Sequence, residues 1–155
     1  METPDSENND QKNYIGDDDL TGVQGELTPN SILLIDDEKE ICRCLGKILE
    51  SAGHSVLTCS KPLETLNYYK KHYMSITLVI IDVVMPKMNG SDLFLEMKSV
   101  NPAIKAIMIS GQCNEDVVTK CLTGGALEFV RKPFTATEII GVVDRHALTS
   151  QSNLS

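Results

Sequence analysis

The chain has 155 residues, 41% of them hydrophobic, and a formal net charge of −8. This length fits one domain with its own core. No stretch approaches the ~18 consecutive apolar residues of a membrane span, and the acidic N-terminus lacks the basic flank and apolar segment of a signal peptide. We therefore expect a cytoplasmic protein without membrane insertion.

Charge is distributed unevenly along the chain. Residues 1–30 hold eight acidic residues and one lysine, whereas the remainder holds 14 acidic and 13 basic residues. The first thirty residues are also poor in large apolar groups, which predicts a disordered acidic tail; a docking segment is the alternative. The remainder shows no basic stripe, so we expect no direct binding of nucleic acid.

Residues 31–148 alternate between short apolar stretches and stretches of helical periodicity. The expected strands are 31–35, 55–59, 77–81, 104–109 and 127–130, and the expected helices follow them at about 38–52, 61–73, 91–100, 114–123 and 135–147. Ser91 and Asn114 are the expected caps of the third and fourth helices. The alternation predicts an α/β domain, a parallel sheet in a single doubly wound unit, followed by a polar tail at 149–155.

The five cysteines give no pattern of their own. No two have C-x-x-C spacing, and Cys42 and Cys44 lie two apart in a helical stretch, where side chains point away from each other. We interpret them as reduced thiols that are mostly buried as small apolar groups. A metal or redox site among them is the alternative.

Polar residues stand at the ends of the expected strands. Asp36 and Asp37 follow the first strand, Asp82 the third, Ser110 the fourth and Lys132 the fifth. The carboxyl ends of parallel strands lie on one edge of a sheet, so these side chains should converge. Each alone has an ordinary role in a cap, a turn or a helix start, but their joint placement predicts a site.

The residue types at this edge indicate phosphate chemistry. Three neighbouring carboxylates repel one another, and a hard divalent cation such as Mg²⁺ relieves the repulsion. The Lys132 ammonium and the Ser110 hydroxyl suit the charge and oxygens of a phosphoryl group. An aspartate carboxylate can itself act as the nucleophile. The sequence therefore predicts Mg²⁺-dependent phosphorylation of a carboxylate.

Four motifs together resemble the receiver domain of two-component response regulators over about residues 30–148. They are Ile35-Asp36-Asp37-Glu38, Asp82-Val83-Val84-Met85-Pro86-Lys87-Met88-Asn89-Gly90, Ser110-Gly111 and Lys132-Pro133-Phe134. The resemblance implies a flavodoxin-like fold with five helices and strand order 2-1-3-4-5.

The resemblance also implies a role for each site residue. Asp82 would be the phosphoacceptor and a metal ligand, loaded by the phosphohistidine of a histidine kinase or phosphotransfer protein. Asp37 would bind Mg²⁺ directly, Asp36 mainly through water, and Val84 through its backbone carbonyl. Ser110 would bond a phosphoryl oxygen and Lys132 would pair with its charge, with a cis peptide bond between Lys132 and Pro133.

The family's switch couples the Ser or Thr after the fourth strand, which Ser110 matches here, to an aromatic residue of the fifth strand, which Phe129 matches. Phenylalanine has no hydroxyl group, so any inward state must rest on packing. Phosphorylation would then repack the surface of helix four, strand five and helix five, and so change its affinity for a downstream protein effector. The short polar tail after the last helix leads us to expect a stand-alone receiver.

Two other functions compete with this interpretation. One is a receiver-like interaction module that never takes phosphate, although such modules usually lose an acidic residue or the lysine. The other is a phosphohydrolase with an aspartyl nucleophile, which needs a second aspartate where Val84 stands. We expect a phosphoacceptor and not an enzyme, with self-phosphorylation from small donors at most and slow self-dephosphorylation, because Val84 cannot orient a water molecule.

Overall fold

Five parallel strands form the centre of the structure, a computed structural model that describes residues 14–15, 22–112 and 114–147. These strands are β3 (Ser31–Ile35), β4 (Val56–Cys59), β5 (Ile76–Asp82), β6 (Ala106–Ser110) and β7 (Glu128–Arg131). The helices are α2 (Lys39–Ser51), α3 (Pro62–His72), α4 (Gly90–Val100), α5 (Glu115–Thr123) and α6 (Ala136–His146), with a short 3₁₀ turn at Tyr73–Ser75. All five expected strands and all five expected helices are therefore present.

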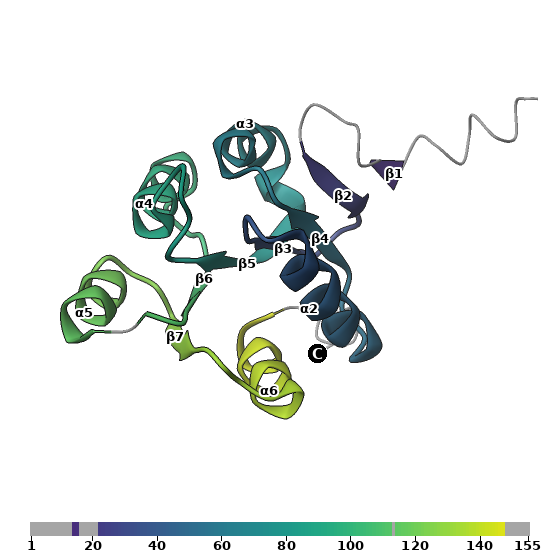
Figure 1. Ribbon diagram of the computed structural model, residues 1–155. Coiled ribbons are helices and arrows are strands. Elements are labelled where there is room, and N and C mark those ends of the chain that lie inside the picture. Colours follow the sequence, from purple (N-terminus) through teal and green to yellow (C-terminus); the bar gives the residue numbers. More distant parts are fainter. Residues whose placement is uncertain (1–13, 16–21, 113, 148–155) are drawn as a thin grey trace, which may run out of the picture.

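The strand order confirms the predicted doubly wound, flavodoxin-like arrangement. The parallel strands lie in the order β4-β3-β5-β6-β7, which is the predicted order 2-1-3-4-5 (Figure 1). Their register brings the last residues of neighbouring strands level, with Asp82 beside Ile109 and Ser110 beside Arg131. The end of β5 therefore lies between the ends of β3 and β6.

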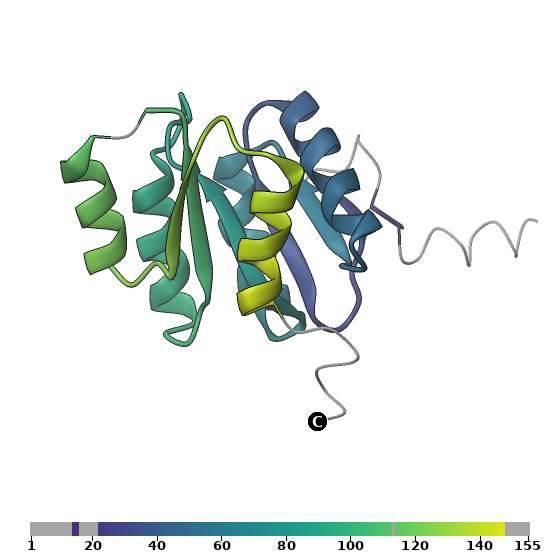
Figure 2. The same ribbon diagram turned by 90° about the horizontal axis from the view of Figure 1, so that it is seen from below.

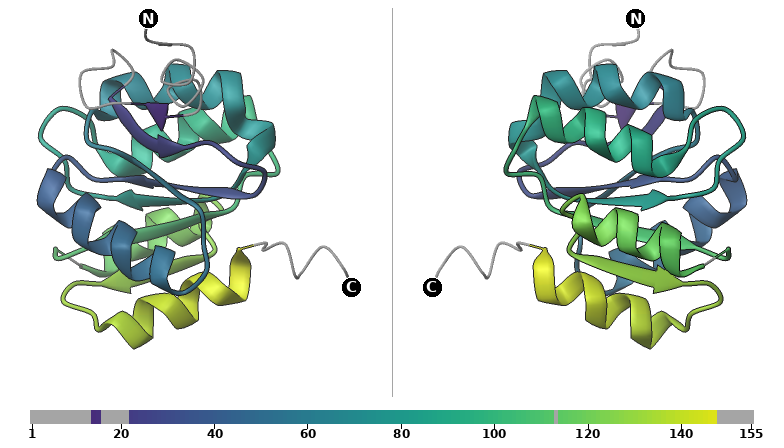
Figure 3. Two further views of the ribbon diagram at one scale, coloured as in Figure 1. Left: turned by 90° about the vertical axis from the view of Figure 1, so that its right-hand side faces the viewer. Right: turned by 90° about the vertical axis from the view of Figure 1, so that its left-hand side faces the viewer.

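Helices cover both faces of the sheet, so the structure has three layers (Figures 1 and 2). Alternate residues of each strand point to opposite faces. Leu33 of β3 packs in a core beneath α3, α4 and α5, whereas Leu34 packs in a second core beneath α2 and α6. Figure 3 shows the two helical layers edge-on. All five residues of β3 are buried, as expected for a central parallel strand.

The prediction of a disordered tail over residues 1–30 is wrong for its last part. Strand β2 (Val23–Glu26) pairs antiparallel with the edge strand β4, and Val23 is fully buried. The two-residue strand β1 (Tyr14–Ile15) pairs with β2. This extension has no clear pattern in the sequence, because an edge strand can form through backbone hydrogen bonds with only one apolar side chain buried. Residues 1–13, 16–21 and the predicted polar tail lie outside the described residues.

The helix starts follow the predictions with one correction. Asn89, and not Ser91, caps α4: its Oδ1 accepts a hydrogen bond from the backbone N–H of Ser91 at 2.8 Å. Asn114 caps α5 as predicted, accepting from the N–H of Val117 at 2.8 Å. Thr135 and Glu138 form a reciprocal capping box at α6.

The described cysteines are all free thiols, and most of them are buried, as expected. Cys42, Cys59 and Cys121 are buried free thiols, Cys44 is an exposed free thiol, and Cys113 lies outside the described residues. Within residues 14–15, 22–112 and 114–147, no helix combines the length and the apolar character that a membrane span requires.

Candidate functional site

The predicted polar residues meet at the carboxyl edge of the sheet. Asp82 is the last residue of β5 and Ser110 the last of β6, while Asp36 directly follows β3 and Lys132 directly follows β7. Asp36 is fully buried and only 4% of Asp82 is exposed. Their burial follows from their position, because each continues a strand that is covered by helices on both faces.

Three carboxylates and one ammonium group form the centre of the site. One carboxylate oxygen from each of Asp36, Asp37 and Asp82 lies within 4.8 Å of the others. The Lys132 Nζ is 3.3 Å from Asp36 Oδ2 and 3.3 Å from Asp82 Oδ2. Buried charges of one sign are costly unless they are paired, so this lysine compensates part of the cluster.

Backbone amides hold the remaining oxygens of the two buried carboxylates. Asp36 Oδ1 accepts a hydrogen bond from the N–H of Glu38 at 2.9 Å, and Asp82 Oδ1 accepts one from the N–H of Val84 at 3.2 Å. Each buried carboxylate therefore points one oxygen at its own following loop and the other at Lys132. Both side chains are fixed in orientation by this arrangement.

The cluster shifts the acidities of its members. Burial, and then the negative charge of Asp36, raises the pKa of Asp82 to about 6 against the opposing effect of Lys132. Burial and Asp36 also raise the pKa of Asp37. Burial acts to lower the pKa of Lys132, but Asp36 and Asp82 outweigh it, so that pKa is raised. The single positive charge of this lysine therefore does not balance the negative charge of the three carboxylates.

The donors at this edge fit a divalent metal ion. Three acidic groups face one ammonium group, and carboxylate oxygens are the hard ligands that Mg²⁺ prefers. Val84 lies in the loop two residues after Asp82, so its backbone carbonyl belongs to the loop that follows β5. Val84 is an exposed apolar residue, with 46% of its surface accessible.

Ser110 lies at the same edge but faces its own loop. Its Oγ accepts a hydrogen bond from the N–H of Gln112 and donates one to the carbonyl of Gln112, both at 3.1 Å. The N–H of Lys132 donates to the Ser110 carbonyl at 2.9 Å, which ties the ends of β6 and β7 together. The peptide bond between Lys132 and Pro133 is cis.

Phe129 is half-buried in β7, beside Met108 of β6. It packs at the border of the core beneath α3, α4 and α5. The switch residue proposed from the sequence thus lies two strands away from Asp82, and it packs against an apolar core.

Gly90 takes part in the site in a way that the sequence did not reveal. A Cβ atom at this position would lie 2.1 Å from the carbonyl oxygen of Asp82, and the N–H of Gly90 donates to the carbonyl of Val83 at 2.8 Å. The start of α4 therefore packs directly on the backbone of the aspartate loop. The dipeptide Asn89-Gly90 indicates a turn, but nothing local reports this close approach.

Known proteins share this sequence pattern and fold. A family model described as the response regulator receiver domain matches residues 32–144. The chain is 34% identical over 126 residues to the DNA-binding transcriptional regulator NtrC of Azospirillum brasilense, covering 81% of this chain and 26% of that relative. It is 30% identical over 112 residues to the response regulator protein TodT of Pseudomonas putida, covering 72% of this chain and 48% of that relative.

Solved structures agree in fold. A response regulator receiver domain protein from Clostridium thermocellum superposes with a TM-score of 0.70 at 35% identity, over 74% of this chain and 91% of that one. The CheX–CheY–BeF₃–Mg²⁺ complex from Borrelia burgdorferi matches with a TM-score of 0.71 at 30% identity, over 76% of this chain and 89% of that one.

The matches to the curated relatives and to the family model differ in how much of each sequence they cover. The chain spans about a quarter to a half of the length of the curated relatives named above. The family match, in contrast, runs through most of this chain and contains all the polar strand ends that meet at the carboxyl edge. The chain therefore belongs to the family of response regulator receiver domains.

Proposed function

We propose that the protein is a phosphorylation-dependent signalling switch in which Asp82 accepts a phosphoryl group from the phosphohistidine of a histidine kinase or phosphotransfer protein. The observation that carries this proposal is the placement of Lys132 Nζ at 3.3 Å from both Asp36 and Asp82. A partly buried lysine shared by two carboxylates lies where the charge of an incoming phosphoryl group needs compensation.

The transfer uses one Asp82 carboxylate oxygen as the nucleophile. This oxygen attacks the phosphorus, a new P–O bond forms and the P–N bond to the histidine breaks. The bonding electron pair stays with the imidazole nitrogen, which takes up a proton. The product is an acyl phosphate on Asp82, whose two oxygens are oriented beforehand by Lys132 and by the N–H of Val84.

Asp37, Asp82 and the backbone carbonyl of Val84 would hold Mg²⁺ directly, and Asp36 through water. A bound Mg²⁺ offsets the charge of the carboxylates and of the phosphoryl oxygens. The cluster of three carboxylate oxygens within 4.8 Å supports this assignment, as does the Mg²⁺ named in the Borrelia burgdorferi complex.

Ser110 and Lys132 bind the phosphoryl group after transfer. The Ser110 hydroxyl must exchange its hydrogen bonds with Gln112 for one with a phosphoryl oxygen. That exchange moves the loop after β6, and Phe129 repacks on the neighbouring strand. The surface of α5, β7 and α6 then changes its affinity for a downstream protein effector.

Intact-mass spectrometry tests the proposal directly. The protein is incubated with Mg²⁺ and a small phosphodonor, beside the variant Asp82→Asn and the surface control Asp92→Asn. We expect one added phosphoryl group on the parent and on the control, none on Asp82→Asn, and none after chelation of Mg²⁺. Equal phosphorylation of Asp82→Asn would refute the assignment of the acceptor.

A further inference from the structure

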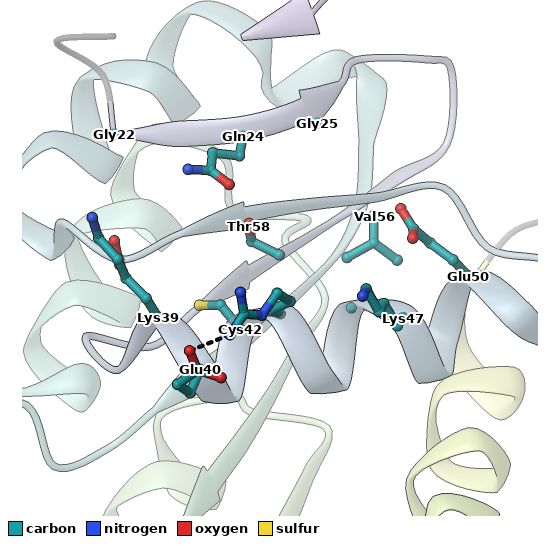
Figure 4. Close-up of a pocket in the computed structure, with 13 residues that line it drawn as sticks. Gly22, Gln24, Gly25, Lys39, Glu40, Cys42, Lys47, Glu50, Val56 and Thr58 are labelled. Carbon is teal, nitrogen blue, oxygen red and sulfur yellow. Dashed lines mark hydrogen bonds and ion pairs between the residues drawn. The ribbon is translucent and has the colours of Figure 1, made fainter. Parts of the chain in front are cut away.

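Cys42 lies in the first turns of α2, close to the loop that carries two of the three carboxylates. Only 4% of this residue is exposed. It stands on the side of α2 that faces Thr58 of β4, and its sulfur atom points toward the start of the helix (Figure 4). In that direction lies the loop of residues 36–38, which joins β3 to α2. The thiol is therefore enclosed by α2, this loop and the end of β4.

The Cys42 thiol contacts the backbone of the acidic loop. It donates a hydrogen bond to the carbonyl oxygen of Asp36 at 3.2 Å, and its Sγ lies 3.8 Å from the carbonyl oxygen of Cys59 at the end of β4. The N–H of Asp36 donates to the same Cys59 carbonyl at 3.1 Å. Both backbone groups of Asp36 are thus held, the N–H by β4 and the carbonyl by α2.

The Asp36 carbonyl belongs to the peptide group that also carries the N–H of Asp37. A peptide group is planar, so a donor that fixes the carbonyl also fixes the direction of this N–H. Burial and Asp36 raise the pKa of Asp37, whereas the backbone N–H of Asp37 itself acts to lower it. That N–H therefore lies close to the Asp37 carboxylate, and the orientation of the peptide group affects this side chain.

Asp37 is less constrained than the other two carboxylates. Asp36 and Asp82 are buried, and each contacts Lys132. Asp37 is only half-buried. A more exposed side chain keeps more rotamer freedom, and this freedom is lost when the side chain binds a metal ion. Groups that hold a ligand in place before the metal arrives therefore raise the affinity for the metal.

We propose that Cys42 is a positioning residue for Mg²⁺, because its thiol fixes the peptide group between Asp36 and Asp37 and so restricts the Asp37 carboxylate. This inference rests on the proposed function, in which Asp37 binds Mg²⁺ directly. Cys42 contacts neither the metal nor the phosphoryl group and acts through one backbone carbonyl. The packing of α2, which begins at Lys39, thereby becomes part of the metal site.

Substitutions in the full chain separate the hydrogen bond from the packing at this position. Cys42→Ala and Cys42→Val both remove the donor, and valine keeps the site filled with an apolar group. Cys42→Ser restores a donor. The control Cys121→Val changes another buried thiol, which lies in the last turn of α5, at the end of that helix far from the carboxyl edge.

Two measurements are made on each protein. A Mg²⁺ titration followed by NMR gives the Kd for the metal, and urea denaturation without metal gives the free energy of unfolding. We expect Cys42→Ala and Cys42→Val to raise the Kd about three- to tenfold, less than the usual loss of about 10- to 100-fold, because a thiol is a weak donor. Cys42→Ser should return the Kd to within about twofold of the parent value, whatever its free energy of unfolding. Cys121→Val should leave the Kd unchanged.

The pattern across the variants decides the proposal. Equal Kd values for the parent, Cys42→Ala and Cys42→Val would overturn it, even if these variants were less stable. A raised Kd that Cys42→Ser does not restore would also overturn it, since the position would then act through packing alone. A parent chain without measurable Mg²⁺ binding would refute the metal site of the proposed function and this inference with it, so the two failures are distinguishable.

Discussion

Replacing Asp82 with asparagine should make the protein more stable in the absence of Mg²⁺. Asp82 is 96% buried, and its carboxylate shares a single lysine with Asp36. Asparagine has nearly the same shape but no charge, so it relieves the repulsion while it keeps an acceptor for the N–H of Val84.

The size of the gain follows from the acidity of the carboxyl group. Its pKa is about 6 in the folded chain against an ordinary value of 3.8. A shift of this size corresponds to roughly 3 kcal/mol of destabilisation at neutral pH, at about 1.4 kcal/mol for each pKa unit. Asparagine loses part of the attraction to Lys132, so we expect a net gain of about 1–3 kcal/mol in the free energy of unfolding.

Urea denaturation at pH 7.5 and at pH 5 measures this gain. The folded carboxyl group binds its proton more tightly than the unfolded one, so its destabilising effect is full above pH 6 and disappears as the pH falls toward 4. The advantage of Asp82→Asn should therefore shrink at pH 5. It should also shrink when Mg²⁺ is added, because the metal binds the parent more tightly. Asp92→Asn, at a side chain that is 62% exposed, should change stability by less than about 0.5 kcal/mol.

A loss of stability in metal-free Asp82→Asn at pH 7.5 would refute this reasoning. It would mean that the attraction between Lys132 and Asp82 outweighs the burial of the carboxylate and its repulsion by Asp36. A gain of the same size at both pH values would also contradict it, since the effect would then not arise from ionisation.

Three further predictions concern the frame of the site. Gly90→Ala should destabilise the protein by about 1–3 kcal/mol in urea denaturation, because its Cβ would lie 2.1 Å from the Asp82 carbonyl oxygen. The control Gly141→Ala, whose Cβ would meet nothing within 4 Å, should be neutral or stabilising by up to ~1 kcal/mol. Equal losses of stability in the two variants would argue against the close approach at Gly90. Val84→Asn should shorten the phosphoryl lifetime about fivefold, because one added hydrogen bond to the attacking water is worth about 1 kcal/mol. Val84→Ala should not shorten it, and the reverse pattern in a dephosphorylation assay would contradict this reasoning. Thr135→Ala should cost about 1 kcal/mol by removing the capping box of α6, and an unchanged urea midpoint would mean that the cap contributes nothing.

Most of the fold could be predicted because the strands are buried on both faces. Each of the five parallel strands appears as a short apolar run, and each helix shows its own periodicity, so element order and sheet topology follow from general rules. Strand β2 could not be predicted, since Val23 is its only buried apolar residue and its pairing with β4 depends on backbone hydrogen bonds. The cap of α4 lies two residues before the predicted one, because Asn89 belongs both to the turn signal Asn89-Gly90 and to the helix start.

The candidate site could be predicted in its membership but not in its contacts. A parallel sheet aligns its strand ends, which brings Asp36, Asp82 and Lys132 together whatever the details. That Lys132 bridges both carboxylates depends on side-chain geometry. The approach of Gly90 to the Asp82 backbone depends on how α4 packs, which no local pattern encodes.

Chemical mapping of the phosphoryl group tests the central claim most directly. Borohydride reduces an aspartyl phosphate to homoserine, which marks the acceptor permanently for peptide mass spectrometry. After phosphorylation with Mg²⁺ present, we predict homoserine at residue 82 and unmodified aspartate at residues 36 and 37. Homoserine at residue 36 or 37, or phosphate retained on a serine, threonine or histidine peptide, would contradict the assignment of Asp82 as the phosphoacceptor.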